Sequence, residues 1–267
     1  MTVKDKILQG RTYLGIELGS TRIKAVLIDD SFSVIASGSK QWENRFENGC
    51  WTYSLDDIHG GIQACYKDLA ENVKAQYGIY PETYGAMGIS AMMHGYMAFD
   101  KNDKLLVPFR TWRNTMTAQA AGELTKLLGF NIPQRWSIAH LYQAVLNKEA
   151  HVPYIAYINT LAGYVHKRLT DRFEVGVGEA SGIFPVESIG YQKEYLELTE
   201  KSLAEKGFDH KLKDILPAVR NAGEKGAVLT EEGAKFLDPE GRLKAGVPVC
   251  PPEGDAGTGM VATDSVL

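Results

Sequence analysis

The chain has 267 residues, of which 44% are hydrophobic and 23% charged, a balance typical of a globular protein with one large core or two smaller ones. Its formal net charge of −4, without Lys/Arg clusters interleaved with aromatic residues, argues against nucleic acid or an anionic membrane surface as partner. We expect a cytoplasmic protein without disulfides or a zinc site, because no secretory signal, no membrane-spanning run of about 18 apolar residues and no CxxC pair is present.

An antiparallel meander is predicted near the N-terminus. Residues 13–18 and 22–29 carry β-branched and aliphatic residues in partial alternation, and a third strand is expected over residues 32–36. The turn between the first two strands consists of the small residues Gly19, Ser20 and Thr21. Such a turn exposes backbone N–H groups and a hydroxyl to an oxyanion such as phosphate, and Lys24 would add positive charge. An ordinary hairpin turn is the alternative interpretation.

Helices and strands then alternate along the chain. Ser54 is a suitable N-cap for an amphipathic helix that ends at Gly78, and residues 84–91 resemble a buried strand. Further helices are predicted over residues 117–129, 137–149, 157–169 and 193–206. This order predicts an α/β sheet covered by helices. The linker-like stretch 221–226 is too short to indicate a domain boundary.

Polar and aromatic residues follow the predicted strand 84–91. Met93 and His94 lie at the end of that strand, where open α/β sheets usually bind their ligands, although a structural, hydrogen-bonded His94 is the alternative. Trp112 comes next to amide and guanidinium groups, including Asn114. A Trp face beside such groups suits a polyhydroxylated ligand, and a Trp packed in the core is the alternative.

Near the C-terminus, residues 247–259 run from a short apolar strand into a glycine-rich turn that presents the carboxylate of Asp255. Gly254 and Gly257 would leave room for a ligand beside it. Acidic turns are common, so the interpretation of Asp255 as a chemical group depends on the anion-binding turn predicted at the other end of the chain.

Taken in order, these segments resemble the carbohydrate kinases of the FGGY family, which include xylulokinase, ribulokinase and glycerol kinase. The similarity covers most of the chain and is greatest to the xylulokinase branch. The matching segments are Gly15-Ile-Glu17-Leu-Gly19-Ser20-Thr21 with Lys24, Met92-Met93-His94-Gly95, Trp112-Arg113-Asn114, Leu169-Thr170-Asp171 with Glu179-Ala180-Ser181-Gly182, and Glu253-Gly254-Asp255-Ala256-Gly257.

The resemblance implies an actin-like, ribonuclease-H-like domain and phosphoryl transfer from ATP, with Mg²⁺, to a hydroxyl of a ketopentose-like sugar or polyol. Asp255 would be the general base, and Glu17 would organise Mg²⁺ through water. The nucleotide phosphates would contact Gly19, Ser20, Thr21, Lys24 and Gly254, and the sugar pocket would be lined by Met93, His94, Trp112 and Asn114.

The chain also departs from the family pattern. Glu17 and Asn114 each replace an Asp, and Met92 replaces a Gln of the xylulokinase branch, so the substrate need not be D-xylulose. Family members have a second domain of comparable size, and this chain stops where that domain begins. We therefore expect residues 1–267 to be the N-terminal sugar-binding domain, without the nucleotide-binding domain. This domain alone is expected to be inactive. The full-length protein is compatible with a homodimer.

Two other functional classes remain open. The Glu17 and Asn114 changes favour a sugar-binding regulatory module that has lost catalysis. An actin-like nucleotide switch on the same fold would need no sugar pocket.

Overall fold

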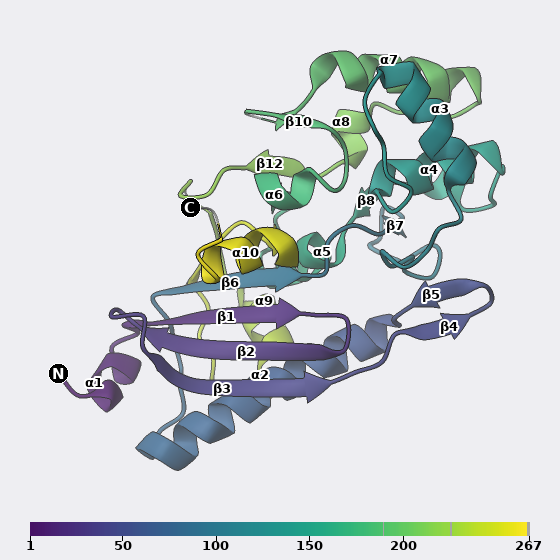
Figure 1. The fold of residues 1–267 in the computed structure, drawn as a ribbon. Coiled ribbons are helices and arrows are strands. Elements are labelled where there is room, and N and C mark those ends of the chain that lie inside the picture. Colours follow the sequence, from purple (N-terminus) through teal and green to yellow (C-terminus); the bar gives the residue numbers. More distant parts are fainter. Residues whose placement is uncertain (189, 225, 266–267) are drawn as a thin grey trace.

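The computed structural model describes residues 1–188, 190–224 and 226–265 (Figure 1). A mixed sheet forms the larger part, in the order β13-β14-β6-β1-β2-β3, with β15 also paired to β6. Its strands are β1 (Thr12–Leu18), β2 (Arg22–Asp29), β3 (Val34–Gln41), β6 (Ala86–Ala91), β13 (Ala227–Val228), β14 (Pro248–Val249) and β15 (Glu253–Gly254). The helices associated with it are α1 (Val3–Leu8), α2 (Leu55–Tyr77), α5 (Leu161–Thr170), α9 (Glu231–Leu237) and α10 (Asp255–Ala262).

A second part lies above the sheet in the view of Figure 1 and is mainly helical. Its helices are α3 (Ala118–Leu128), α4 (Ser137–Leu146), α6 (Val177–Ala180), α7 (Lys193–Glu205) and α8 (Leu212–Ile215), with a 3₁₀ turn at Val152–Tyr154. Four short strand pairs lie outside the main sheet among the described residues: β4 (Arg45–Glu47) with β5 (Cys50–Thr52), β7 (Met97–Phe99) with β8 (Tyr157–Asn159), β9 (Glu174–Gly176) with β12 (Ala218–Arg220), and β10 (Val186–Glu187) with β11 (Gly190–Tyr191).

The predicted meander is confirmed. β1, β2 and β3 pair antiparallel, and β1 pairs in parallel with β6 on its other side. Exposure alternates along β2, where Ile23, Ala25 and Leu27 are buried while Lys24 and Val26 face the opposite side of the sheet. The third strand is longer than predicted and extends to Gln41, because its backbone stays hydrogen-bonded to β2.

The predicted helix between Ser54 and Gly78 is also confirmed as α2. The Ser54 hydroxyl accepts from the Asp57 N–H, the Asp57 carboxylate accepts from the Ser54 N–H, and Gly78 ends the helix in the left-handed conformation. α2 packs so closely on β3 that a Cβ atom on Gly38 would lie 2.5 Å from the carbonyl oxygen of Cys65. This helix and strand therefore meet through their backbones.

Buried apolar residues of the described segments form two clusters. One lies between the sheet and α2, and includes Leu14, Ile16, Ile58 and Leu69. The other joins α3, α4 and α7 through residues such as Leu124, Leu141 and Leu203. Each part of the molecule thus has a core of its own, as expected for a chain of this length.

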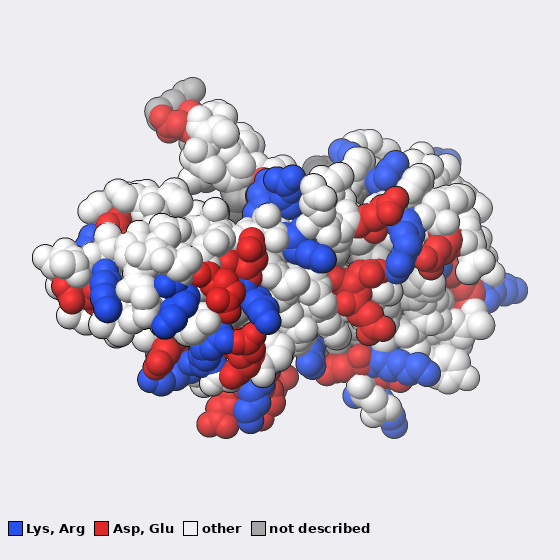
Figure 2. Space-filling view, turned by 90° about the horizontal axis from the view of Figure 1, so that it is seen from below, with Lys and Arg blue, Asp and Glu red and all other residues white. Residues whose placement is uncertain are grey.

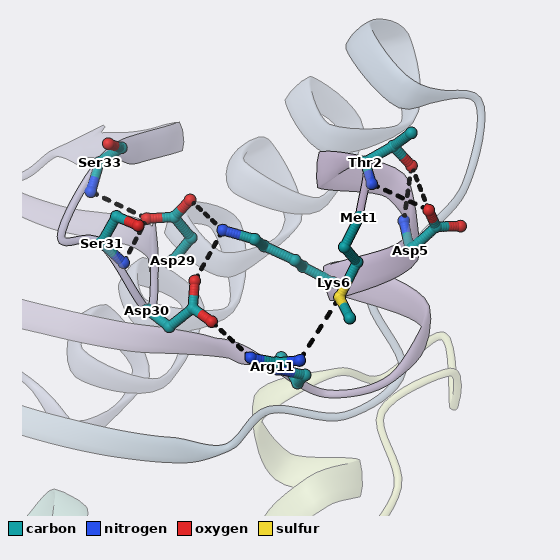
Figure 3. Close-up of polar contacts among 9 residues, drawn as sticks. All are labelled: Met1, Thr2, Asp5, Lys6, Arg11, Asp29, Asp30, Ser31 and Ser33. Atoms are coloured by element: carbon teal, nitrogen blue, oxygen red, sulfur yellow. Dashed lines mark hydrogen bonds and ion pairs between the residues drawn. The ribbon is translucent and has the colours of Figure 1, made fainter.

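The N-terminal helix is attached to the sheet by an ionic network (Figure 3). Lys6 Nζ lies 2.7 Å from the carboxylate of Asp29 and 2.6 Å from that of Asp30, and Arg11 pairs with Asp30 at 2.7 Å. Asp29 also accepts backbone N–H groups of the turn between β2 and β3. The network therefore fixes the end of β2 that is farther from the turn at Gly19.

Three predictions about secondary structure were wrong in part. The helix predicted over 157–169 begins only at Leu161, because Tyr157–Asn159 pairs with β7 and Thr160 accepts from the Gly163 N–H as its N-cap. The helix over 137–149 ends at Leu146. Asp255 lies in the first turn of α10, where a glycine-rich turn was predicted. The linker-like stretch 221–226 includes residue 225, which lies outside the described residues.

The surface carries charges of both signs. In the face seen in Figure 2, acidic and basic side chains are interspersed and neither sign forms a continuous patch. Cys50 and Cys65 are buried and Cys250 is exposed, all three unpaired. In the described part of the chain, no helix combines the length and apolar character needed to cross a membrane.

Candidate active site

The two ends of the chain meet on either side of β6. β6 lies between β1 and β15, so that Ser90 is paired with Glu17 on one side and with Glu253 on the other. One residue further, Ala91 is paired with Leu18 and Gly254. The turn that follows Leu18 and the carboxylate of Asp255 therefore emerge from the same edge of the sheet, with α10 beside β6 in Figure 1.

A cavity of about 650 Å³ opens on the face of the sheet opposite α2. Its walls are strand residues such as Gly15, Glu17 and Gly88, and Thr258 of α10. The cavity is largely apolar. It includes Glu17 of the predicted site, but Asp255 and Trp112 do not line it, so the cavity contains only part of that site. Glycines in the strands leave this face of the sheet open to a ligand.

The turn at Gly19 is held by aromatic donors. Trp42 Nε1 donates to the Gly19 carbonyl at 2.7 Å, and the Tyr53 hydroxyl donates to the Ser20 carbonyl at 2.6 Å. Trp112 Nε1 donates to the Ser20 Oγ at 3.1 Å. Both carbonyls of the turn are therefore hydrogen-bonded to side chains of the protein itself.

The N–H groups of this turn are only partly available to an anion. The Gly19 N–H closes the hairpin by donating to the Arg22 carbonyl at 3.1 Å, in contrast to the expectation that it is exposed. The N–H groups of Ser20 and Thr21 have no acceptor among the residues described by the structure. These two groups, with the Ser20 hydroxyl, are the donors that an oxyanion could use.

Glu17 and Lys24 are paired across β1 and β2. Their side chains form an ion pair of 3.2 Å and both are partly exposed at the cavity. The carboxylate of Glu17 also lies over Gly19, where a Cβ atom would be 3.1 Å from Glu17 Oε1. Lys24 is thus paired with Glu17, and both side chains keep solvent-exposed surface at the cavity.

Asp255 is half-buried at the first position of α10, after Gly254 as N-cap. Its Oδ1 accepts the backbone N–H of Met93 at 3.2 Å. Burial raises the pKa of Asp255 above its ordinary value; the Met93 and Ala256 N–H groups oppose this rise, and the charge of Glu17 adds to it. A fixed carboxylate with a raised pKa suits a group that accepts a proton.

Met93 lies next to Asp255, and the side chains of Met93 and His94 pack closely against glycines. A Cβ atom on Gly254 would overlap the Met93 side chain, and one on Gly182 would lie 2.6 Å from His94 Nδ1. Gly254 is therefore required for packing, whereas the sequence suggested that it leaves room for a ligand. His94 has a left-handed backbone (φ 69°), and burial lowers its pKa to about 4, so its ring is neutral at pH 7.

Trp112 and Asn114 differ in how they are placed. Trp112 is 38% exposed, whereas Asn114 is 3% exposed. Asn114 Oδ1 accepts from the Trp51 N–H at 2.9 Å, and its Nδ2 donates to the carbonyls of Trp51 and Thr111. Asn114 therefore connects β5 to the Trp112 loop, and a direct contact with a sugar would have to use the remaining lone pair of Oδ1.

Sequence reasoning missed three residues of this site. Trp42 and Tyr53 hold the turn at Gly19, although nothing in their spacing indicated it. The side chain of Glu179 packs against Gly254, and its carboxyl group is buried. Its segment was recognised only as part of a motif, without a role for the side chain.

Comparison with known proteins gives a consistent result. The profile of the "FGGY family of carbohydrate kinases, N-terminal domain" matches residues 12–262. A curated xylulose kinase from Lactococcus lactis subsp. lactis (strain IL1403) is 23% identical over 124 residues, which cover 43% of this chain and 23% of that protein.

Solved structures show the same similarity of fold. The xylulose kinase from Rhodospirillum rubrum superposes with a TM-score of 0.74 at 18% identity, over 92% of this chain and 49% of that one. The gluconate kinase from Lactobacillus acidophilus gives a TM-score of 0.69 at 18% identity, over 91% and 48%. The chain thus spans about half the length of these structures, and the predicted actin-like, ribonuclease-H-like fold is confirmed.

Proposed function

Since the chain belongs to the FGGY family of carbohydrate kinases, we propose that it is the sugar-binding part of an enzyme that phosphorylates a sugar or polyol hydroxyl with ATP. The observation that carries the proposal is the half-buried carboxylate of Asp255, which follows β15 and is separated from Glu17 and the turn at Gly19 by β6 alone. A ketopentose-like acceptor is proposed because xylulose kinases are among the relatives.

In the proposed reaction, Asp255 takes the proton of the substrate hydroxyl. The hydroxyl oxygen forms a bond to the γ-phosphorus while the bond from that phosphorus to the ADP oxygen breaks. Met93 holds the carboxylate through its N–H, and the exposed face of Trp112 is a surface on which a sugar ring can pack. Most of the acceleration would come from positioning and charge stabilisation, as is general for phosphoryl transfer.

The residues at the turn fit ATP phosphates and Mg²⁺. Ser20 and Thr21 offer N–H groups to phosphate oxygens, and Glu17 offers a partly exposed carboxylate. Across residues 1–188, 190–224 and 226–265, no group of three or more His, Cys, Asp or Glu side chains could hold a metal ion alone. Mg²⁺ typically needs only one or two carboxylates besides water and phosphates, and when bound it neutralises charge on the phosphates.

We propose that residues 1–267 are one domain of the full-length enzyme and that a second domain supplies the adenine pocket. Support comes from the solved relatives, of which the chain covers about half. The chain alone should then bind sugar weakly and turn over ATP negligibly, because catalysis would require closure of two domains around the substrates.

Trp112 is expected to hold Ser20 with its ring N–H and to pack against the sugar with its ring face, and substitutions can separate these two roles. Trp112→Phe keeps an aromatic face but removes the N–H that holds Ser20. In the full-length protein we expect sugar KM to change little while kcat falls by roughly 2- to 10-fold, the equivalent of one lost hydrogen bond. Trp112→Ala should in addition raise the sugar KM. Steady-state kinetics with varied sugar and ATP give both values.

Trp136→Phe is the matched control, since Trp136 lies at the start of α4 among Phe130 and other residues of the second part. Its kinetics should equal those of the wild type. If Trp112→Phe raises the sugar KM as much as Trp112→Ala does, the separate role of the N–H is refuted.

Isothermal titration calorimetry of this chain tests the proposed function without ATP turnover. The panel is ketopentoses, ketohexoses, glycerol and gluconate, with ATP–Mg²⁺ titrated separately. We expect at least one sugar or polyol to bind, with binding lost in Trp112→Ala. Binding of the nucleotide together with none of the sugars would favour an actin-like switch instead.

A further inference from the structure

One buried acidic side chain is left unused by the proposed mechanism. Glu179 of α6 is 0% exposed, and neither carboxyl oxygen makes a hydrogen bond of good geometry with the described residues, the Thr160 side chain being its polar neighbour. An unpaired carboxylate in such a place would cost much free energy, whereas the neutral acid costs far less. A buried polar group of this kind needs an explanation.

The contacts of Glu179 lead directly to Asp255. Its backbone N–H donates to Glu253 Oε2 at 2.9 Å. Its side chain lies against Gly254, where a Cβ atom would be 2.9 Å from Glu179 Oε2 and 2.8 Å from Met93 Sδ. Glu179 therefore touches both residues that precede Asp255, while Met93 packs on Gly254 and binds the Asp255 carboxylate with its N–H.

The charges around Glu179 are acidic. Burial raises its pKa to about 8; the Thr160 side chain opposes this rise, and the carboxylates of Glu253 and Asp255 add to it. Tyr191 of β11 is the neighbouring phenol, and burial raises its pKa as well. Glu174 of β9 and Arg220 of β12, on the other elements against α6, form an ion pair of 2.9 Å with each other.

We propose that Glu179 is a positioning residue for Asp255 that works as a neutral carboxylic acid. It holds Glu253 and Gly254 in place without adding a negative charge beside the base. Only the role of Asp255 as base rests on the proposed function. The packing and the proton on Glu179 are properties of this chain and can be tested without sugar or ATP.

Urea unfolding of the chain between pH 5 and pH 8 tests the proton on Glu179. A carboxyl with a raised pKa in the folded state binds more protons there than in the unfolded state, so its contribution to stability falls as pH rises from about 4.5 to about 8. Glu179→Gln cannot titrate. The urea midpoint of Glu179→Gln minus that of the wild type should therefore increase steadily with pH, and contributions from buried histidines cancel in this difference.

Glu205→Gln, at the exposed end of α7, is the matched control and should give a difference that does not change with pH over this range. A pH-independent difference for Glu179→Gln would overturn the neutral-acid assignment.

The backbone amide of Met93 reports the position of Asp255 in proton–nitrogen NMR spectra of the chain. Because this N–H donates to Asp255 Oδ1, its proton shift should be retained in Glu179→Gln and in Glu205→Gln. Glu179→Asp withdraws the carboxyl by one methylene and should move the resonance upfield as the hydrogen bond weakens. An unchanged Met93 resonance in Glu179→Asp would overturn the positioning role, whether or not the full-length protein proves to be a kinase.

Discussion

Asp255→Asn is expected to lower kcat of the full-length protein by about 10²- to 10⁴-fold, the range for loss of a general base. The amide has nearly the same shape as the carboxylate but cannot accept the hydroxyl proton. Its carbonyl oxygen can still accept the Met93 N–H, so the fold and the sugar KM should change little. A coupled assay of ATP consumption with the preferred sugar gives both constants.

Asp264→Asn is the matched control because Asp264 lies just after α10 and is exposed. Its left-handed backbone, φ 55°, is one that Asn also tolerates, so activity should equal that of the wild type. If Asp255→Asn retained activity within a few-fold of the wild type, Asp255 would not be the base. A wild-type protein without kinase activity on any sugar would instead favour a binding module that has lost catalysis.

Gly38→Ala should cause a large loss of stability. A Cβ atom there would meet backbone atoms of α2, lying 2.5 Å from the Cys65 carbonyl oxygen and 2.8 Å from the Leu69 Cα. Backbone cannot rotate away as a side chain can, so β3 and α2 must separate along their shared core. We expect a loss of about 3 kcal/mol or somewhat more in the free energy of unfolding, at the upper end for overpacking.

Gly88→Ala provides the contrast, since Gly88 is in the same sheet and a Cβ atom added to it would have no neighbouring atom within 4 Å on the open face. Replacing a strand glycine by alanine without a clash should leave stability unchanged or raise it by roughly 0.5–1 kcal/mol. Urea unfolding of both variants measures the two effects. Equal stability of Gly38→Ala and Gly88→Ala would show that α2 does not pack on β3 in this way.

Patterns that depend on neighbouring residues predicted the structure well. The meander and the helix between Ser54 and Gly78 follow from alternation, helical periodicity and a capping pair, all of which lie within a few residues of one another. The segment 157–169 failed because Tyr157–Asn159 is set by pairing with β7, some sixty residues earlier. Such a partner is not visible in local periodicity.

The site was predictable in its chemistry but less so in its geometry. The types of residue around Asp255 and Gly19 suggested a carboxylate and an anion-binding turn, and the structure brings them together through β6. The sequence did not show that the Gly19 N–H closes the hairpin or that Gly254 accommodates Met93. These details depend on close approaches between distant segments, as does the burial of Glu179.

The most direct test of the proposed kinase activity is mass spectrometry of the products formed by the full-length protein from ATP and the sugar and polyol panel. We predict that at least one panel member gains a single phosphate, in a 1:1 ratio to the ADP formed, and that Asp255→Asn abolishes this product while Asp264→Asn does not. ADP formation without any phosphorylated panel member, or equal yields of phosphorylated product from the wild type and Asp255→Asn, would contradict it.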